Sequence, residues 1–193
     1  MFWKSVRPTR HERTRRLPGD ELLPKLAEST THAITIRRPP REVWPWLVQM
    51  GAGRAGWYSY DVIDNGGKHS AESIQLALQA IRVGTVFPAL PNVTDAFTVL
   101  KYEREISLVL GWVPAPGSQP TMTWALVLEP IGTGETRLIE RGRAGLDYHP
   151  YGLPRWLALR LAPMAHAIMV RKHLLGIKSR VEGREIELSG EKQ

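Results

Sequence analysis

Aromatic and polar side chains that could hold a small molecule are concentrated in two parts of the sequence. The first is the segment Trp57–Asp61, in which a tryptophan and two tyrosines precede a carboxylate. The second is a group of candidate strands that carries Trp112 and Trp124 and then the charged run that begins at Glu140. Apolar walls with a few polar groups are typical of a ligand pocket, and carboxyl or phenol groups placed there can transfer protons.

The same residues also have a simpler interpretation. Tryptophans at alternating strand positions are core residues more often than ligand contacts. A strand that carries several charged residues usually faces solvent. The sequence leaves both interpretations open.

A glycine-rich segment, Gly51-Ala-Gly-Arg-Ala-Gly56, matches the dinucleotide-binding pattern G-x-G-x-x-G, and Glu72 follows at about the right interval. That pattern binds phosphate only between a strand and a helix of a parallel βαβ unit. Here the residues before Gly51 have helical periodicity, and the chain beyond has the two-residue period of antiparallel strands. We therefore expect no nucleotide cofactor.

Metal and nucleophile motifs are missing from the sequence. It contains no cysteine, which excludes disulfides, cysteine-based zinc sites and a cysteine nucleophile. His166 and His173 share one candidate helix, but seven residues separate them by about 10 Å, too far for one zinc ion. Hydrolase and phosphate-loop motifs do not occur either, although a catalytic dyad brought together by folding would carry no such motif. We expect no metal and no cofactor.

The net charge of +7 is concentrated at the N-terminus. Residues 1–16 contain six basic residues and one acidic residue, Glu12. A short basic tail of this kind is more often a solvated arm than a binding surface. The sequence also contains no helix-turn-helix, zinc-finger or RNA-recognition pattern. We therefore do not expect nucleic acid or an acidic membrane surface as a partner of the arm.

No segment has the features of a signal peptide or a membrane span. Residues 14–17 resemble a twin-arginine signal, but Pro18-Gly19 follows where an apolar region would begin. The most apolar later stretch, residues 153–170, is interrupted by two arginines and Pro163. We expect a cytoplasmic protein without a transmembrane segment.

The length of 193 residues predicts one domain. We expect a basic extended arm over residues 1–30, the domain over 31–185 and a tail over 186–193. A β-branched stretch over 31–37 predicts the first strand, which Pro39-Pro40 ends. Apolar residues then recur at helical spacing as far as Gly51. Residues 57–64, which Asn65-Gly66-Gly67 ends, could be helical, but their periodicity leaves this open. Residues 73–81 are a short helix or turn, and 83–87 is a further strand.

Two apolar rows at a spacing of two residues predict a meander of antiparallel strands. They run from Ile106 to Trp112 and from Met122 to Leu128, and a glycine-containing turn joins the second row to a strand over 136–143. After Pro163 the period returns to 3.6 residues, which predicts a long amphipathic helix. The pattern favours an α+β protein whose curved antiparallel sheet wraps around the C-terminal helix, with two short helices after the first strand.

Four segments of this chain resemble the SRPBCC superfamily, the START/Bet v 1-like helix-grip proteins. More narrowly, they resemble its bacterial polyketide cyclase/dehydrase-like and lipid-transport-like members, over about residues 17–182. The resemblance implies a helix-grip fold with a hydrophobic cavity between sheet and C-terminal helix, and no iron, because no Rieske motif occurs. It is carried by Thr31-His-Ala-Ile-Thr-Ile, Pro39-Pro-Arg-Glu-Val-Trp-Pro-Trp-Leu-Val-Gln-Met-Gly51, Arg54-Ala-Gly-Trp-Tyr-Ser-Tyr-Asp61 and Met169-Val-Arg-Lys-His-Leu-Leu-Gly-Ile-Lys178.

Members of the superfamily share a cavity and not a reaction. We expect this chain to bind a hydrophobic or aromatic small molecule, such as a lipid, polyketide or isoprenoid. The alternative is a polyketide cyclase or dehydratase-like enzyme that uses polar residues of the same cavity. The residues expected to line it are Trp57, Tyr58, Tyr60, Asp61, Trp112, Trp124, Glu140, Arg141 and Met169.

Overall fold

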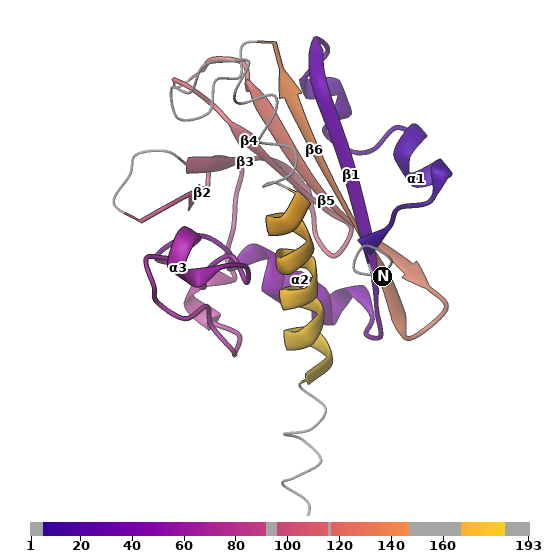
Figure 1. The fold of residues 1–193 in the computed structure, drawn as a ribbon, viewed down its shortest axis with the longest axis vertical. Coiled ribbons are helices and arrows are strands. Elements are labelled where there is room, and N and C mark those ends of the chain that lie inside the picture. The colour runs from indigo at the N-terminus through magenta and orange to yellow at the C-terminus, as the bar shows by residue number, and fades with distance from the viewer. Residues whose placement is uncertain (1–5, 92–95, 116, 147–166, 184–193) are drawn as a thin grey trace, which may run out of the picture.

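The structure is a computed structural model, and it describes residues 6–91, 96–115, 117–146 and 167–183 (Figure 1). The strands are β1 (Leu26–Ile36), β2 (Val86–Pro88), β3 (Ala96–Glu103), β4 (Ser107–Trp112), β5 (Met122–Ile131) and β6 (Glu135–Gly145). The helices are α1 (Arg10–Thr14), α2 (Pro40–Val48) and α3 (Asp61–Asp64), with short 3₁₀ turns at Asp20–Leu22 and Leu76–Leu78. Residues 167–183 form the C-terminal helix.

The six strands form one antiparallel sheet in the order β1-β6-β5-β4-β3-β2. The first strand therefore pairs with the last at one edge, and the sheet curves without closing. The C-terminal helix lies across one face of this sheet, whereas α1 lies on the far side of β1 (Figure 1). This arrangement confirms the predicted α+β helix-grip fold.

Most of the predicted elements are present with shifted ends. β1 begins at Leu26, five residues before the predicted start, because β6 continues to pair with it as far as Gly145. The second helix ends at Val48 and not at Gly51, and the strand predicted over 83–87 is the three-residue β2. The two apolar rows lie on β4 and β5 as predicted. The division into arm, domain and tail stays a prediction.

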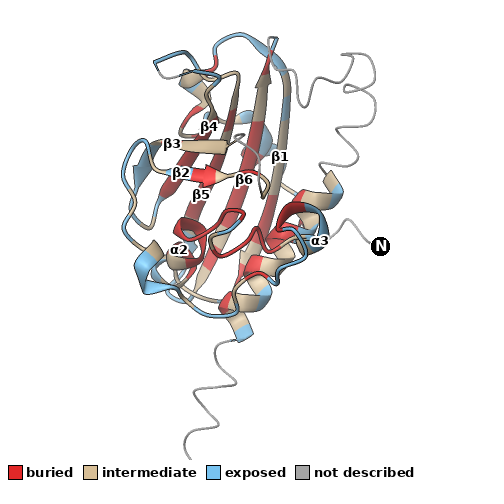
Figure 2. Ribbon diagram, turned by 90° about the vertical axis from the view of Figure 1, so that its left-hand side faces the viewer, coloured by how far each residue is buried: buried red, intermediate tan, exposed pale blue. Residues whose placement is uncertain are grey.

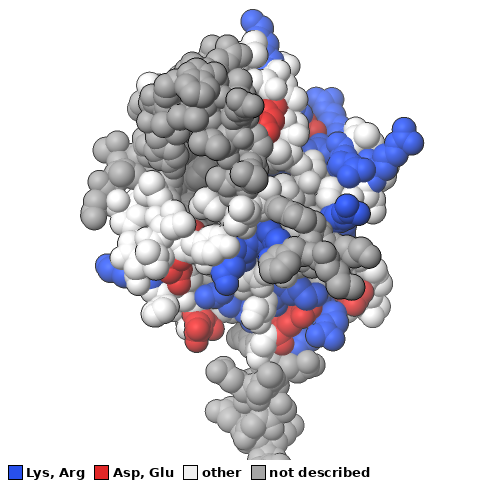
Figure 3. Space-filling view, in the orientation of Figure 1, with Lys and Arg blue, Asp and Glu red and all other residues white. Residues whose placement is uncertain are grey.

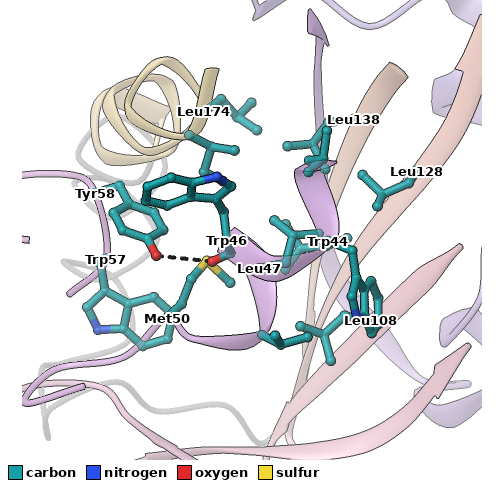
Figure 4. Close-up of a cluster of buried hydrophobic side chains, with 14 of the residues drawn as sticks. Trp44, Trp46, Leu47, Met50, Trp57, Tyr58, Leu108, Leu128, Leu138 and Leu174 are labelled. Atoms are coloured by element: carbon teal, nitrogen blue, oxygen red, sulfur yellow. Dashed lines mark hydrogen bonds between the residues drawn. The ribbon is translucent and has the colours of Figure 1, made fainter. Parts of the chain in front are cut away.

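The main core lies between the sheet and the helices that cover it (Figure 2). Leu128 and Leu138 of the strands belong to one apolar cluster with Leu47 and Trp46 of α2, and Trp46 lies beside Tyr58 and Leu174 (Figure 4). The C-terminal helix contributes the apolar face that the 3.6-residue period predicted. That face consists of Val170, Leu174, Ile177 and Val181, all buried, and Ala167, which is half-buried.

The N-terminal segment lies against the outer face of the sheet, which differs from the solvated arm that we expected. Leu17 packs there in a second, smaller apolar cluster with Ala33, Val127 and Ile139. The segment had no hydrophobic period because its attachment is largely polar, through hydrogen bonds from arginines of β6 to its backbone. The sequence pattern therefore gave no sign of this contact.

Arg141 makes most of that attachment. Its guanidinium donates to the carbonyl oxygens of Glu12, Arg13 and Arg15 at 2.5, 3.1 and 2.9 Å. It also donates to Oδ2 of Asp20 at 2.7 Å. Five N–H groups in a rigid fork suit an arginine to this task. The side chain is 4% exposed, so these partners replace its contacts with water.

The arginines of the N-terminal segment have two different environments: one pairs with the sheet, and the others face solvent. Arg15 is half-buried and pairs with Glu129 of β5. The remaining arginines of the described segment face solvent, and Lys and Arg side chains gather beside α1 in Figure 3. These exposed residues are Arg7, Arg10, Arg13 and Arg16. Within the described part of the chain, no helix is long and apolar enough to cross a bilayer.

The C-terminal helix makes one very close backbone contact at Gly176. A Cβ atom built there would lie 2.0 Å from the carbonyl oxygen of Tyr58, so the position has room only for glycine. Tyr58 itself has a φ of 57°, which is uncommon for a bulky residue. This contact determines how closely the C-terminal helix packs against the loop that carries Trp57 and Tyr58.

We expect Gly176→Ala to destabilise the protein by about 1–3 kcal/mol, because the added methyl group forces helix and loop apart. The matched control is Gly183→Ala on the same helix, where a Cβ meets nothing within 4 Å. Chemical denaturation of the three proteins measures the difference. Equal stabilities of the two variants would contradict the close contact.

Candidate functional site

The alternation of side chains along β6 places Glu140 and Arg141 on opposite faces of the sheet. Glu140 points to the inner face, under the C-terminal helix, and is 1% exposed. Arg141 points to the outer face and holds the N-terminal segment. A carboxyl group buried on the inner face of a helix-grip sheet is therefore the starting point for the site.

The two oxygens of Glu140 have different surroundings. Nε1 of Trp124, on the neighbouring strand, donates a hydrogen bond to Oε1 at 2.8 Å. Oε2 has no hydrogen-bond partner among the described residues, and it lies 4.0 Å from Nε2 of His173 on the C-terminal helix. His32 of β1 lies directly across the strand pair from Glu140. One buried acid thus faces two histidines from two different elements.

The surroundings of Glu140 and His173 determine which of their atoms carry protons. Burial raises the pKa of Glu140 to about 8, and the hydrogen bond from Trp124 offsets only part of that shift. The carboxyl group is therefore largely protonated at neutral pH. Nδ1 of His173 lies 2.5 Å from the carbonyl oxygen of Trp57, which can only accept, so Nδ1 carries a proton and Nε2 faces the acid. Burial also lowers the pKa of His32.

Four aromatic rings that contact one another adjoin Glu140 and His173 through Trp124. The ring centroids of Trp57 and Trp124 are 5.4 Å apart, as are those of Phe97 and Trp124 and those of Phe97 and Trp112. The imidazole of His173 lies 5.4 Å from the Trp124 ring. Phe97, Trp112 and Trp124 are only half-buried, unlike the sealed core below them. We call these six residues, Glu140 and His173 with the four rings, the Glu140 cluster.

Of the candidate residues from the sequence, Tyr58 lies in the closed core. Its hydroxyl accepts a hydrogen bond from Nε2 of Gln49 at 2.9 Å and donates one to the carbonyl of Trp46 at 3.1 Å (Figure 4). Burial raises the pKa of the phenol further above its ordinary value. The guanidinium of Arg180 lies over its ring. These contacts occupy the hydroxyl group within the core.

Other candidates lie outside the Glu140 cluster. Tyr60 is 39% exposed. Asp61 accepts hydrogen bonds from the backbone and hydroxyl of Ser70, and so fixes the loop around α3. Met169 is half-buried, and its carbonyl accepts from Ser59. The cluster therefore unites Trp57, Trp112, Trp124 and Glu140, and Arg141 lies on the other side of the sheet.

His173, Phe97 and His32 belong to the site or its border, but the sequence did not point to them. In the sequence, the spacing of His173 from His166 suggests only a shared metal ion, and that spacing is too long for one; His166 lies outside the described residues. Its position three residues after Val170, on the apolar side of the helix, was the available signal. Phe97 carried a similar signal, because it begins the alternating row of β3. Periodicity places both residues on the inner side of their elements, but it does not predict which residues of other elements they contact.

The glycine-rich segment has a structural role here. Gly51 and Gly56 exchange backbone hydrogen bonds of 3.1 and 3.0 Å, so the loop closes on itself. It follows α2 and precedes an antiparallel sheet, which rules out the βαβ setting of a dinucleotide site. Among the described residues, no group of three or more potential ligands could hold a metal ion. A surface pocket lined by residues 80–82 and 84–86 contains none of the Glu140 cluster.

No protein-family model matches the sequence, and no curated protein matches it. Several solved structures are similar to it, including the following three. The KanY protein is 15% identical, with 80% of this chain and 97% of that chain covered and a TM-score of 0.50. Protein MLL2253 from Mesorhizobium loti is 15% identical over 80% of this chain and 96% of that one, with a TM-score of 0.49. CalU16 from Micromonospora echinospora is 15% identical over 84% and 82%, with a TM-score of 0.42. At such identities a likeness concerns the fold alone, and KanY agrees with the helix-grip arrangement.

The pKa of Glu140 predicts how stability changes with pH. Since the folded value of about 8 exceeds the ordinary 4.5, the folded protein keeps a proton that the unfolded chain releases. Between these values stability should fall as pH rises, by at most about 1.4 kcal/mol per pH unit. Glu140→Gln removes this loss.

Urea denaturation of wild type and Glu140→Gln at several pH values tests the effect, since contributions from other residues cancel in the difference. The stability of the variant relative to wild type should increase from pH 5 to pH 8. A constant difference over that window would contradict a protonated Glu140.

Proposed function

We propose that the chain is a member of the SRPBCC superfamily and binds a hydrophobic or aromatic small molecule on the inner face of its sheet, against the Glu140 cluster. Lipids, polyketides and isoprenoids are the ligand classes that suit such a surface. The observation that carries the proposal is a buried acid beside aromatic rings of which Phe97, Trp112 and Trp124 are only half-buried. One oxygen of this acid has no hydrogen-bond partner among the described residues. A cytoplasmic location remains part of this prediction.

Glu140 supports this proposal because burying its carboxyl group lowers the stability of the fold. Glutamate is rarely fully buried, and an incompletely bonded carboxyl group in an apolar site costs stability that a leucine would not. Among the residues that the structure describes, no arginine or lysine forms an ion pair with either of its oxygens. Titratable groups with such displaced pKa values are concentrated at functional sites. A role in ligand contact accounts for an acid at this position.

The aromatic rings support the same proposal. Each buries a large apolar area when covered, and edge and offset contacts between rings are favourable in themselves. Trp57 is held from behind by a hydrogen bond from Nε1 to the carbonyl of Ala89 at 3.0 Å. Phe97, Trp112 and Trp124 retain partly uncovered area. A planar or branched apolar ligand would cover that area and gain the corresponding free energy.

A second candidate function is a cyclase or dehydratase-like reaction in the same place. The approach of Oε2 of Glu140 to Nε2 of His173 favours it, because a neutral carboxylic acid and an imidazole are a suitable general acid and base. Of the polar residues that the sequence predicts in the cavity, Glu140 is the one that lies in the cluster. Tyr58 is bound within the core, and Arg141 faces the opposite side.

Mass spectrometry of freshly purified protein, first native and then denatured, tests ligand binding. We expect a small apolar molecule to be released from wild type on unfolding, and Trp124→Leu to retain at least about tenfold less of it, because a large ring contact is lost. Tyr102→Leu is the matched control, since Tyr102 packs on Trp44 away from the cluster. Equal retention by Trp124→Leu and wild type would contradict the proposal.

The Glu140→Gln variant separates a carrier from an enzyme. A carrier should release the same molecule from wild type and variant, because an amide still fits beside Trp124. An enzyme that protonates its substrate through Glu140 should accumulate the unconverted compound in the variant, with a mass that differs from the wild-type product. Identical masses from both proteins would reject the enzymatic alternative.

A further inference from the structure

The gap between Glu140 and His173 has a defined length and chemistry. Oε2 and Nε2 are 4.0 Å apart, which is too long for a direct hydrogen bond. An oxygen atom placed about 2.8 Å from each of them would form two normal hydrogen bonds. The remaining polar atoms of both side chains are bound elsewhere, Oε1 to Trp124 and Nδ1 to the carbonyl of Trp57. The two facing atoms therefore determine what fits between them.

One proton is shared between these facing atoms. When Glu140 holds it, Oε2 donates and Nε2 of a neutral imidazole accepts. When His173 holds it, Nε2 donates and Oε2 accepts. In both cases one side of the gap offers a donor and the other an acceptor. A group that satisfies both must itself donate and accept.

We propose that a hydroxyl group of the ligand, as in an alcohol or a phenol, bridges Oε2 of Glu140 and Nε2 of His173. This inference rests on the proposed function and specifies the ligand class for that same surface. A carbonyl or ether oxygen only accepts, and an ammonium group only donates, so each would leave one side of the gap unsatisfied. The aromatic rings would contact the apolar body that carries the hydroxyl group.

Other titratable groups near the pair do not change this assignment. His32 is the neighbour of Glu140 on β1, and burial favours its neutral form. Arg141 follows Glu140 on β6 but faces the outer side. On the C-terminal helix, Lys172 is exposed, and Arg180 donates to the carbonyl of Ala71.

Arg171, on the same helix, is half-buried and makes contacts of its own. No ion pair between a lysine or arginine and Glu140 occurs in the part of the chain that the structure describes. The pKa of Glu140 is therefore raised by burial and lowered in part by the hydrogen bond from Trp124.

Four small bicyclic probes test the proposal by calorimetry at pH 7: indane, indan-2-ol, indan-2-one and indan-2-amine. They share one apolar body and differ in the group offered to the gap. Indan-2-ol should bind on the order of tenfold tighter than indane, the gain of a well-placed hydrogen-bonded hydroxyl. Indan-2-one and indan-2-amine should not share that gain.

The outcomes distinguish this inference from the proposed function. Equal affinities of indane and indan-2-ol would overturn the inference, leaving water as the occupant of the gap, while ligand binding itself would stand. Tightest binding of indan-2-amine would also overturn it, in favour of an ionised carboxylate that selects cations. Failure of all four probes to bind would reject the proposed function and the inference together.

Three variants test whether Glu140 causes the preference for indan-2-ol over indane. Glu140→Gln should keep most of it, because the amide nitrogen still donates across the gap while the amide oxygen accepts from Trp124. Glu140→Leu should bind indane at least as well as wild type and lose the preference for indan-2-ol. Glu129→Gln, on the half-exposed Arg15 pair of β5, is the matched control and should leave every affinity unchanged. A preference that survives in Glu140→Leu would overturn the inference.

Discussion

The two-residue alternation along β6 determines the chemistry of both faces of the sheet. Because neighbouring side chains must point in opposite directions, Glu140 is placed under the C-terminal helix and Arg141 against the N-terminal segment. Arg141 finds carbonyl and carboxylate partners on its side. Within the described part of the chain, Glu140 accepts one hydrogen bond, from Trp124, and lies 4.0 Å from the imidazole of His173. Burial raises its pKa, so it is a neutral acid in an aromatic environment. The same strand thus anchors the arm through an ion pair and supplies the polar group of the site.

The position of the C-terminal helix completes this arrangement. The close approach of Gly176 to the carbonyl of Tyr58 brings helix and loop together, and the hydrogen bond from His173 to Trp57 joins them again one turn earlier. These two contacts set the distance between the imidazole and Glu140. Both contacts position the helix, and with it the imidazole, whose Nε2 lies 4.0 Å from Oε2 of Glu140. A site whose spacing is held in this way is pre-organised for an inserted group.

Periodicity was enough to predict the fold, since the rows of β4 and β5 and the apolar face of the terminal helix stand out in the sequence. The site was predicted in part. The residue types of Trp57, Trp124 and Glu140 were enough to predict them. Arg141 was wrongly placed with Glu140, because β6 is covered on both faces. Its neighbouring residues Leu138 and Ile139 are both apolar and buried, so the sequence does not show which side chains point inward. The pairing of His173 with Glu140 joins positions 33 residues apart across the fold, and no local pattern records such a contact.

The proposed binding surface requires Glu140 to be a neutral, buried acid. An NMR titration of its side-chain carboxyl carbon, assigned by comparison with Glu140→Gln, measures this property directly. Titration with a midpoint near 8 is the result that the structure predicts. A midpoint near 4.5, the ordinary value of a glutamate, would mean that the carboxyl is ionised and solvated, and would contradict both the burial and the binding site built on it.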